Sequence, residues 1–197
     1  IDLPNELKGF VPEVEYYDRY YRKGGWSSLT IVSLAIGQGE LGFTPMQMAN
    51  MTATIANRGY YITPHIVSNV EGQPINEVDT AIKRHESGID AKNFDEVVNA
   101  MFKVVEQGTG TMAKIEGIEV CGKTGTVENP HGDDHSTFIA FAPKDDPQIA
   151  ISVYVENGYW GSRWAAPIAG LMIEQYMRDS ISTNRKWIEK RMLEGDL

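Results

Sequence analysis

The chain has 197 residues, of which 42% are hydrophobic and 23% are charged, a balance typical of one globular domain rather than a disordered or repetitive polymer. Its formal net charge of -9 argues against a nucleic-acid partner or an anionic membrane surface, because these are bound by clustered Lys and Arg. A single cysteine, Cys121, excludes an internal disulfide and a multi-cysteine metal site.

The start of the chain, Ile1-Asp2-Leu3-Pro4, has neither an initiator methionine nor a basic leader. No apolar run approaches the roughly 20 residues that span a bilayer. We therefore expect a soluble piece of a longer protein. Residues 1–28 contain many aromatic residues without clean periodicity, which predicts an irregular segment with short helical pieces that needs another surface to pack on.

The first strong helix signal is at Thr44. Its hydroxyl suits an N-cap, Pro45 suits the first helical position, and Gln47 stands three residues after the cap, as in a capping box. Gly59 is placed to end this helix. The helix is expected to pack in the core along the side that carries Met48, Ala49, Thr52, Ile55 and Ala56.

The middle of the chain predicts a short strand within residues 60–70 and a polar surface loop over residues 71–88. A second helix is predicted from Asn93 as N-cap, with Glu96 in the capping-box position, and it breaks at Gly108. Its expected core positions are Val97, Val98, Met101, Val104 and Val105.

The last third of the chain changes to a strand pattern. Three apolar runs, at residues 118–127, 137–141 and 148–155, are joined by short turns and predict an antiparallel meander. A helix beginning near Ala165 should then cover one face of this sheet, and the charged tail from Asn184 should add a short solvated helix. In the helix that begins near Ala165, the residues expected to face the sheet are Ile168, Leu171, Met172 and Tyr176.

The stretch Lys123-Thr124-Gly125-Thr126, the KTGT motif, falls inside the first of these strands. A phosphate loop of the Walker type needs a longer glycine-bearing loop before its lysine and a helix after it, and this stretch meets neither condition. Along a strand, an ammonium group and two hydroxyls instead suit a carboxylate-ended ligand, and Gly125 leaves space beside the backbone. An extended peptide is expected to pair with this strand edge.

Further stretches accompany the KTGT motif in a fixed order: Ile36-Gly37-Gln38-Gly39, Thr44-Pro45-Met46-Gln47-Met48-Ala49, Ala56-Asn57-Arg58-Gly59, Pro64-His65, Gly108-Thr109-Gly110, Phe138-Ile139-Ala140-Phe141-Ala142-Pro143 and Val155-Glu156-Asn157-Gly158. Together with the K-T-G signature they resemble class B penicillin-binding proteins, most closely the elongation type called penicillin-binding protein 2. The resemblance covers nearly the whole chain. It implies the α/β (α+β) fold of the β-lactamase and penicillin-binding transpeptidase superfamily, an antiparallel sheet flanked by helices, with residues 1–197 forming the C-terminal portion of one domain.

The resemblance also implies an activity, that of a peptidoglycan DD-transpeptidase in which a serine attacks the penultimate D-Ala carbonyl of a stem peptide. It assigns Lys123 to the hydroxyl network and the electrostatics of the site, and Thr124 and Thr126 to the carboxylate of the substrate or of a β-lactam. The Thr126 N–H would form half of the oxyanion hole. Gly125 would keep the strand open for the ligand.

The partners that the resemblance implies are peptidoglycan stem peptides, β-lactam antibiotics and, through the full-length protein, a membrane glycosyltransferase of the elongation machinery. It implies no nucleic acid, no cofactor and no metal. The full-length protein would sit in the bacterial inner membrane with its catalytic domain on the periplasmic side.

The sequence departs from the family in lacking any Ser-x-x-Lys, so the chain contains no nucleophile. The nearest imitations, Thr111-Met112-Ala113-Lys114 and Ser182-Thr183-Asn184, stand in the wrong part of the chain. We therefore expect the chain to be inactive alone, and either to pair with another copy or to be marginally stable.

Two alternative functions stay open at this point. One is a serine β-lactamase or DD-carboxypeptidase, which shares K-T-G but transfers the acyl group to water. The other is a non-catalytic β-lactam sensor or pseudo-enzyme.

Four other residues invite a functional interpretation. Cys121 is expected to point to the face opposite Lys123 as a buried small hydrophobe. His135, beside two aspartates, is expected to be a solvated loop histidine. Trp160 and Trp164 flank a glycine-containing turn and either shape a groove wall or cover the C-terminal helix.

Overall fold

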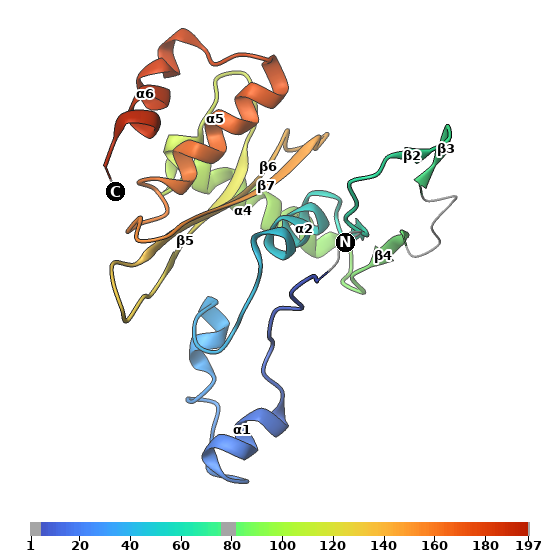
Figure 1. Cartoon of the computed structure of the whole chain (residues 1–197), viewed down its shortest axis with the longest axis vertical. Helices are drawn as coiled ribbons and strands as arrows, with labels where there is room; N and C mark the ends of the chain where they lie inside the picture. Colours follow the sequence, from blue (N-terminus) through green and yellow to red (C-terminus); the bar gives the residue numbers. More distant parts are fainter. Residues whose placement is uncertain (1–4, 76–81, 197) are drawn as a thin grey trace.

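The computed structural model describes residues 5–75 and 82–196 and is built around a three-stranded antiparallel sheet (Figure 1). Its strands are β5 (Cys121–Val127), β6 (His135–Ala142) and β7 (Ile149–Val155), in the order β5-β6-β7. The predicted meander is therefore confirmed. The strand that contains the KTGT motif begins at Cys121 rather than at residue 118, because an isolated bridge between Ile115 and Ile118 makes a tight turn before it.

Helices cover both faces of this sheet. The helices α2 (Pro45–Ala56) and α4 (Lys92–Gln107) pack on one face, and α5 (Ala165–Arg178) packs on the other. The α2/α4 side has a core of Ala56, Val98, Met101, Cys121 and Phe141. The α5 side has a larger core that includes Val105, Ala113, Ile115, Val120, Phe138, Ala140, Ala142, Ile151, Ala165, Ala166, Ala169 and Ile173. Successive residues of β6, such as Ala140 and Phe141, thus enter different cores, since side chains alternate along a strand.

The start of α2 follows the predicted pattern. The Thr44 hydroxyl accepts from the Gln47 backbone N–H at 3.2 Å, and the Gln47 side chain accepts from the Thr44 N–H at 2.9 Å. Pro45 occupies the first turn, where its missing N–H has no partner to lose. The capping box is therefore confirmed, and the helix gives way at Asn57 and Gly59.

The start and the buried side of α4 differ from the prediction. Asn93 lies inside the first turn and is not the N-cap, because the helix begins one residue earlier, with the Asp90 carboxylate accepting from the Lys92 N–H at 3.3 Å. Val97 is 43% exposed, whereas Phe94 is buried. The buried face is therefore Phe94, Val98, Met101 and Val105, a regular spacing of three or four residues that excludes Val97.

The segment between α2 and α4 contains more structure than predicted. The expected strand within residues 60–70 is split, and the polar loop after it carries further strand residues. The described strands of this segment are β1 (Tyr60–Ile62), β2 (Asn69–Val70), β3 (Gln73–Pro74) and β4 (Arg84–Glu86), which form two antiparallel pairs, β1 with β4 and β2 with β3. Residues 76–81 of the predicted loop lie outside the described part of the chain.

The helix α5 faces the sheet with its small residues, not with the larger ones that we predicted. Met172 and Tyr176 are 53% and 60% exposed. Ala165, Ala166 and Ala169 are buried instead, because small residues let the helix backbone approach the sheet closely. Gly170 is also buried, but against the backbone of Ala113. Ile173 adds a large apolar side chain that is fully buried in the core on this side of the sheet.

The charged tail is also less solvated than predicted. A short 3-10 helix η3 (Thr183–Arg185) leads into α6 (Lys186–Glu194), which packs on α5 and buries Ile188. Arg185 is itself nearly buried, and its Nε lies 2.9 Å from a carboxylate oxygen of the fully buried Glu174. Burial lowers the pKa of the Arg185 guanidinium below its ordinary value, and Glu174 opposes that shift.

The N-terminal segment forms an arm that extends from the sheet and its helices (Figure 1). It contains α1 (Val14–Tyr21) and the 3-10 helix η1 (Val32–Ile36), so the predicted irregular segment with short helical pieces is confirmed. Aromatic residues cluster along α1, and the Tyr17 hydroxyl donates to Glu40 at 3.0 Å. Burial and this carboxylate raise the pKa of Tyr17 to about 12. Among the described residues, no helix is both long and apolar enough to cross a bilayer.

The buried ion pair makes a testable contribution to stability. Replacing Glu174 by Ala leaves the Arg185 cation buried without its carboxylate, and we expect a loss of about 3–5 kcal/mol in the free energy of unfolding. Urea denaturation followed by circular dichroism measures it. The control is Glu189→Ala, which breaks the exposed Lys186–Glu189 pair and should cost no more than about 1 kcal/mol. Equal losses for the two variants would contradict this account.

Candidate functional site

The KTGT motif lies on β5, which is paired on one side only among the described strands. Lys123 pairs with Ile139 and Gly125 with Thr137, both on β6. In an antiparallel ladder, one residue directs its N–H and C=O to the same side, and the next residue directs them to the other side. The Gln38 side chain, which comes from outside the sheet, donates to the Thr126 carbonyl at 2.9 Å, and we infer that this carbonyl is directed to the edge away from β6. The backbone N–H of Thr126 therefore points to the same open edge.

Lys123 is exposed, and its ammonium donates to the Thr124 carbonyl at 2.7 Å. Cys121 is fully buried, as predicted, but it does not point to the opposite face. Two residues apart on a strand, Cys121 and Lys123 share one face, and they differ because α2 and α4 cover only the first of them. Burial raises the pKa of the Cys121 thiol to about 12, so this sulfur stays protonated near neutral pH.

Thr124 has a hydroxyl partner from outside the motif. The Thr109 hydroxyl lies 2.7 Å from the Thr124 hydroxyl, with either oxygen able to donate. Thr109 stands in the turn that ends α4, where the N–H groups of Gly108 and Gly110 both donate to the Val104 carbonyl. A Cβ on Gly110 would approach Phe138 and Val104 to 3.2 Å, so a small residue lets this turn lie against the sheet. The turn thereby places one hydroxyl beside the motif.

Gly125 lies where two neighbouring segments come very close. A Cβ there would lie 2.3 Å from the Thr137 hydroxyl oxygen, so the space expected for a ligand on this side is taken by Thr137. Gly161 approaches the same place, since its own Cβ would lie 2.7 Å from the Gly125 carbonyl and 2.4 Å from the Thr137 carbonyl. Both glycines are needed for this packing. The role of Gly125 in substrate binding stays a prediction.

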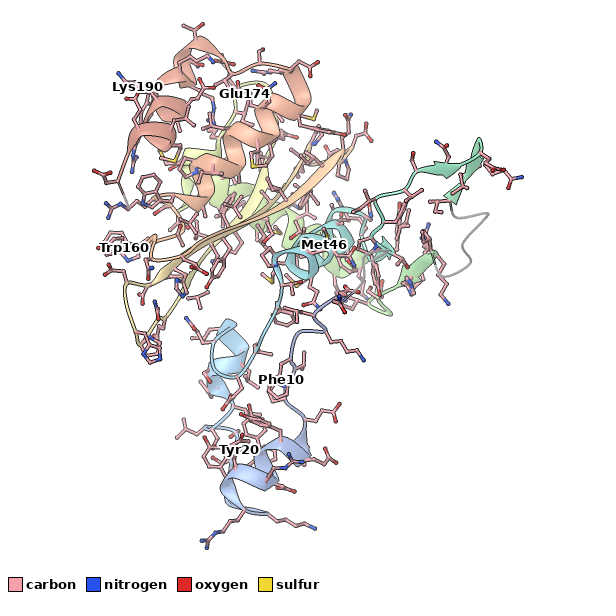
Figure 2. The ribbon with its side chains drawn as sticks, viewed as in Figure 1. Phe10, Tyr20, Met46, Trp160, Glu174 and Lys190 are labelled. Carbon is pink, nitrogen blue, oxygen red and sulfur yellow. The ribbon has the colours of Figure 1, made fainter. Side chains whose placement is uncertain are left out.

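The two tryptophans have different environments. Trp164 is buried at the start of α5 and lies close to Gly195 after α6, so it covers the C-terminal helices. Trp160 is 67% exposed and lies at the outer end of the sheet, apart from Phe10 and Tyr20 in the arm (Figure 2). Its carbonyl accepts from the buried Ser136 hydroxyl at 2.8 Å, which holds the loop on β6. Trp160 therefore does not cover the C-terminal helices as Trp164 does, and its role in shaping a groove wall stays a prediction.

His135 is the first residue of β6 and not a solvated loop residue. Its Nδ1 accepts from the Asn157 N–H at 3.0 Å, and its ring lies 5.3 Å from that of Tyr154. The acceptor role of Nδ1 places the proton of a neutral ring on Nε2. The histidine thus ties the loop after β7 to the start of β6.

The two imitations of missing motifs have structural partners. The Ser182 hydroxyl donates to Glu174 and accepts from Arg178 at 3.1 Å. Lys114 forms an ion pair with Glu106 at the end of α4. Neither imitation is brought to β5 by these contacts. Across residues 5–75 and 82–196, no three His, Cys, Asp or Glu side chains gather in a way that could hold a metal ion.

Comparisons with known proteins agree with this architecture. A family model described as penicillin binding protein transpeptidase domain matches residues 1–174. The chain is 32% identical over 194 residues to the peptidoglycan D,D-transpeptidase MrdA of Acinetobacter baumannii, an alignment that covers 90% of this chain and 28% of that protein. The chain thus spans less than a third of the length of this relative.

Two solved structures extend the comparison. The PBP2 of Pseudomonas aeruginosa, in complex with WCK 5153, is 34% identical with a TM-score of 0.77, covering 94% of this chain and 42% of that one. The PBP2 of Helicobacter pylori, in complex with MreC, is 26% identical with a TM-score of 0.70, covering 89% of this chain and 32% of that one. The expected fold is therefore confirmed.

The close packing around Gly125 can be tested by a double-mutant cycle. Gly125→Ala forces a methyl group against the Thr137 hydroxyl, whose rotamer is restricted by β-branching, and should cost about 1–3 kcal/mol in the free energy of unfolding. Combining it with Thr137→Ala removes that oxygen, so urea denaturation should report a favourable coupling of about 1 kcal/mol. Strictly additive losses would show that the two residues do not meet.

Proposed function

The chain belongs to the penicillin-binding protein transpeptidase domain family, and we propose that the whole protein is a peptidoglycan D,D-transpeptidase of the elongation type. A serine supplied by the remainder of the protein attacks the penultimate D-Ala carbonyl of a stem peptide and releases the terminal D-Ala. The amine of a neighbouring stem peptide then attacks the acyl-enzyme, which forms the cross-link and frees the serine. β-Lactams acylate the same serine.

The observation that carries this proposal is the placement of the KTGT motif on an open strand edge. The backbone groups of Thr124 and Thr126 point away from β6, and an extended peptide needs such an edge to pair with. In this proposal Thr126 contributes its N–H to the oxyanion hole, where a backbone donor stabilises the negative charge that develops on the attacked carbonyl oxygen.

In this proposal the side chains of the KTGT motif have separate roles. The Lys123 ammonium is exposed beside the edge and supplies positive charge for the serine side of the site. The hydroxyls of Thr124 and Thr126 donate to the terminal carboxylate of the peptide or antibiotic. Gly125 acts indirectly in this scheme, since its missing side chain lets Thr137 and Gly161 pack against the strand.

The partners and the location follow from the same proposal. The H. pylori PBP2 structure contains this relative in complex with MreC. By analogy, we infer that the whole protein has partners in the cell-wall elongation machinery, including a membrane glycosyltransferase. The protein would be held in the inner membrane with this domain in the periplasm, where its stem-peptide substrates lie. The outer edges of β5 and β7, which pair with no other strand in the described part of the chain, also support self-association of the chain when it is separated from the rest of the protein.

Covalent labelling of the full-length protein with a fluorescent penicillin tests the function. We expect a labelled band on denaturing gels, and a loss of roughly 100-fold or more in labelling rate for Lys123→Ala, because the pocket loses its cation. The 197-residue chain alone should not be labelled, since it contains no Ser-x-x-Lys.

The matched control is Lys103→Ala, which removes an exposed lysine from α4. Its labelling rate should equal that of the unchanged protein. A full-length protein that folds but takes no label would contradict the transpeptidase proposal and favour a non-acylating relative. A labelled 197-residue chain would contradict the assignment of the nucleophile to the rest of the protein.

A further inference from the structure

The contact between Gln38 and Thr126 joins residues 88 positions apart in the sequence. The Gln38 amide donates to the Thr126 carbonyl at 2.9 Å, and the side chain of Gln38 is half-buried. The carbonyl belongs to the last residue of the KTGT motif and lies on the open edge. No other strand is paired with that edge among the described residues. A side chain from the N-terminal arm thus provides the hydrogen bond that a neighbouring strand would otherwise provide.

The loop that carries Gln38 is held in one conformation. Gly37 and Gly39 flank it with φ of 78° and 75°, a left-handed backbone that strains residues with a side chain. The Gln38 N–H donates to the Ser33 carbonyl at 3.0 Å, and a Cβ on Gly39 would lie 2.7 Å from the Ser33 hydroxyl. The glutamine is therefore presented by a closed turn after η1 rather than by a free loop.

The hydrogen bond has a consequence for the neighbouring backbone donor. The N–H and C=O of Thr126 share one residue and point to the same edge. A donor fixed on the carbonyl restrains the rotation of Thr126 about its backbone dihedrals and therefore the direction of its N–H. An oxyanion hole depends on such donors being aimed before the reaction begins, because reorientation during the reaction would cost part of the stabilisation.

We propose that Gln38 is a positioning residue of the transpeptidase site, which holds the Thr126 carbonyl so that the Thr126 N–H is aimed at the carbonyl oxygen under attack. This inference rests on the proposed function. Gln38 itself touches neither the nucleophile nor the reacting carbonyl in this scheme. It acts through Thr126, and so it should affect the acylation step more than the initial binding of the substrate.

The test uses the full-length protein and stopped-flow acylation by a fluorescent penicillin, which separates the acylation rate constant from the dissociation constant of the first complex. Gln38→Glu keeps the shape but has no proton to donate near neutral pH, and Gln38→Met keeps the length without polarity. We expect both to lower the acylation rate constant by about 10- to 100-fold, with the dissociation constant changed by no more than about threefold. Active-site titration normalises each rate to the folded fraction.

The pH dependence provides a readout that a merely structural role would not move. As the pH falls toward the ordinary pKa of a glutamic acid, about 4.3, the Gln38→Glu side chain regains an O–H donor. Its deficit relative to the unchanged protein should therefore shrink, while that of Gln38→Met should not. The matched control for the added charge is Gln73→Glu on the exposed strand β3, which should leave the acylation rate constant unchanged.

Each other outcome overturns the inference. An unchanged acylation rate constant in the Gln38 variants means that the contact has no catalytic consequence. An increased rate constant means that Gln38 blocks the edge and does not organise it. A change confined to the dissociation constant assigns Gln38 to binding. Failure of the unchanged full-length protein to be acylated at all is a different result, which contradicts the proposed function itself.

Discussion

Within residues 5–75 and 82–196, β5 pairs with another strand on one side only, and this is the constraint on which the site depends. Pairing with β6 satisfies the backbone of Lys123 and Gly125 and fixes the register of the motif against Ile139 and Thr137. The same pairing directs the backbone groups of Thr124 and Thr126 outward. A strand paired on both sides would have no main-chain groups left for a peptide, and an unpaired strand would have no fixed geometry. The single partner gives both a rigid frame and an edge that no other described strand covers, on which the carbonyls of Thr124 and Thr126 accept from the side chains of Lys123 and Gln38.

Close packing behind the strand makes that frame possible despite its glycines. Glycine in a strand interior normally weakens it, because the residue brings flexibility and no side chain to pack. Here neighbouring groups occupy the space that side chains would need: Phe138 lies against Gly122, and the Thr137 hydroxyl lies against Gly125. On the α5 side of the sheet, the loop at Gly161 packs closely against the backbone of Gly125 and Thr137. The glycines therefore mark positions at which neighbouring groups pack directly against the strand backbone and restrict its movement.

Local signals explain which parts of the fold could be predicted from the sequence. The capping box at Thr44 and Gln47 is a contact between residues three apart, so its pattern is visible without the fold. The start of α4 was predicted too late in the chain because Asp90 and Asn93 are both good capping residues, and in the structure the Asp90 carboxylate accepts the Lys92 N–H. The buried side of α5 was missed because hydrophobicity favours Met172 and Tyr176, whereas close approach to the sheet favours alanine and glycine.

The site was predictable only in part for a related reason. The KTGT motif is contiguous, and its residue types and strand placement suggest a carboxylate-binding edge. Gln38 and Thr109 belong to glycine-containing stretches of the family resemblance, which assigns no role to either side chain. Their contacts with Thr126 and Thr124 join distant parts of the chain, and the sequence holds no periodic signal for such contacts. The flanking glycines were the available hint, since they indicate turns that present one side chain.

The most direct measurement is a crystal structure of the full-length protein acylated by benzylpenicillin. We expect the acyl group to lie along the open edge of β5, with its carboxylate within about 3 Å of the Thr124 or Thr126 hydroxyl and its carbonyl oxygen at the Thr126 N–H. An acyl group bound away from β5, with no contact to the KTGT motif, would contradict the central claim that this edge is one wall of the transpeptidase site.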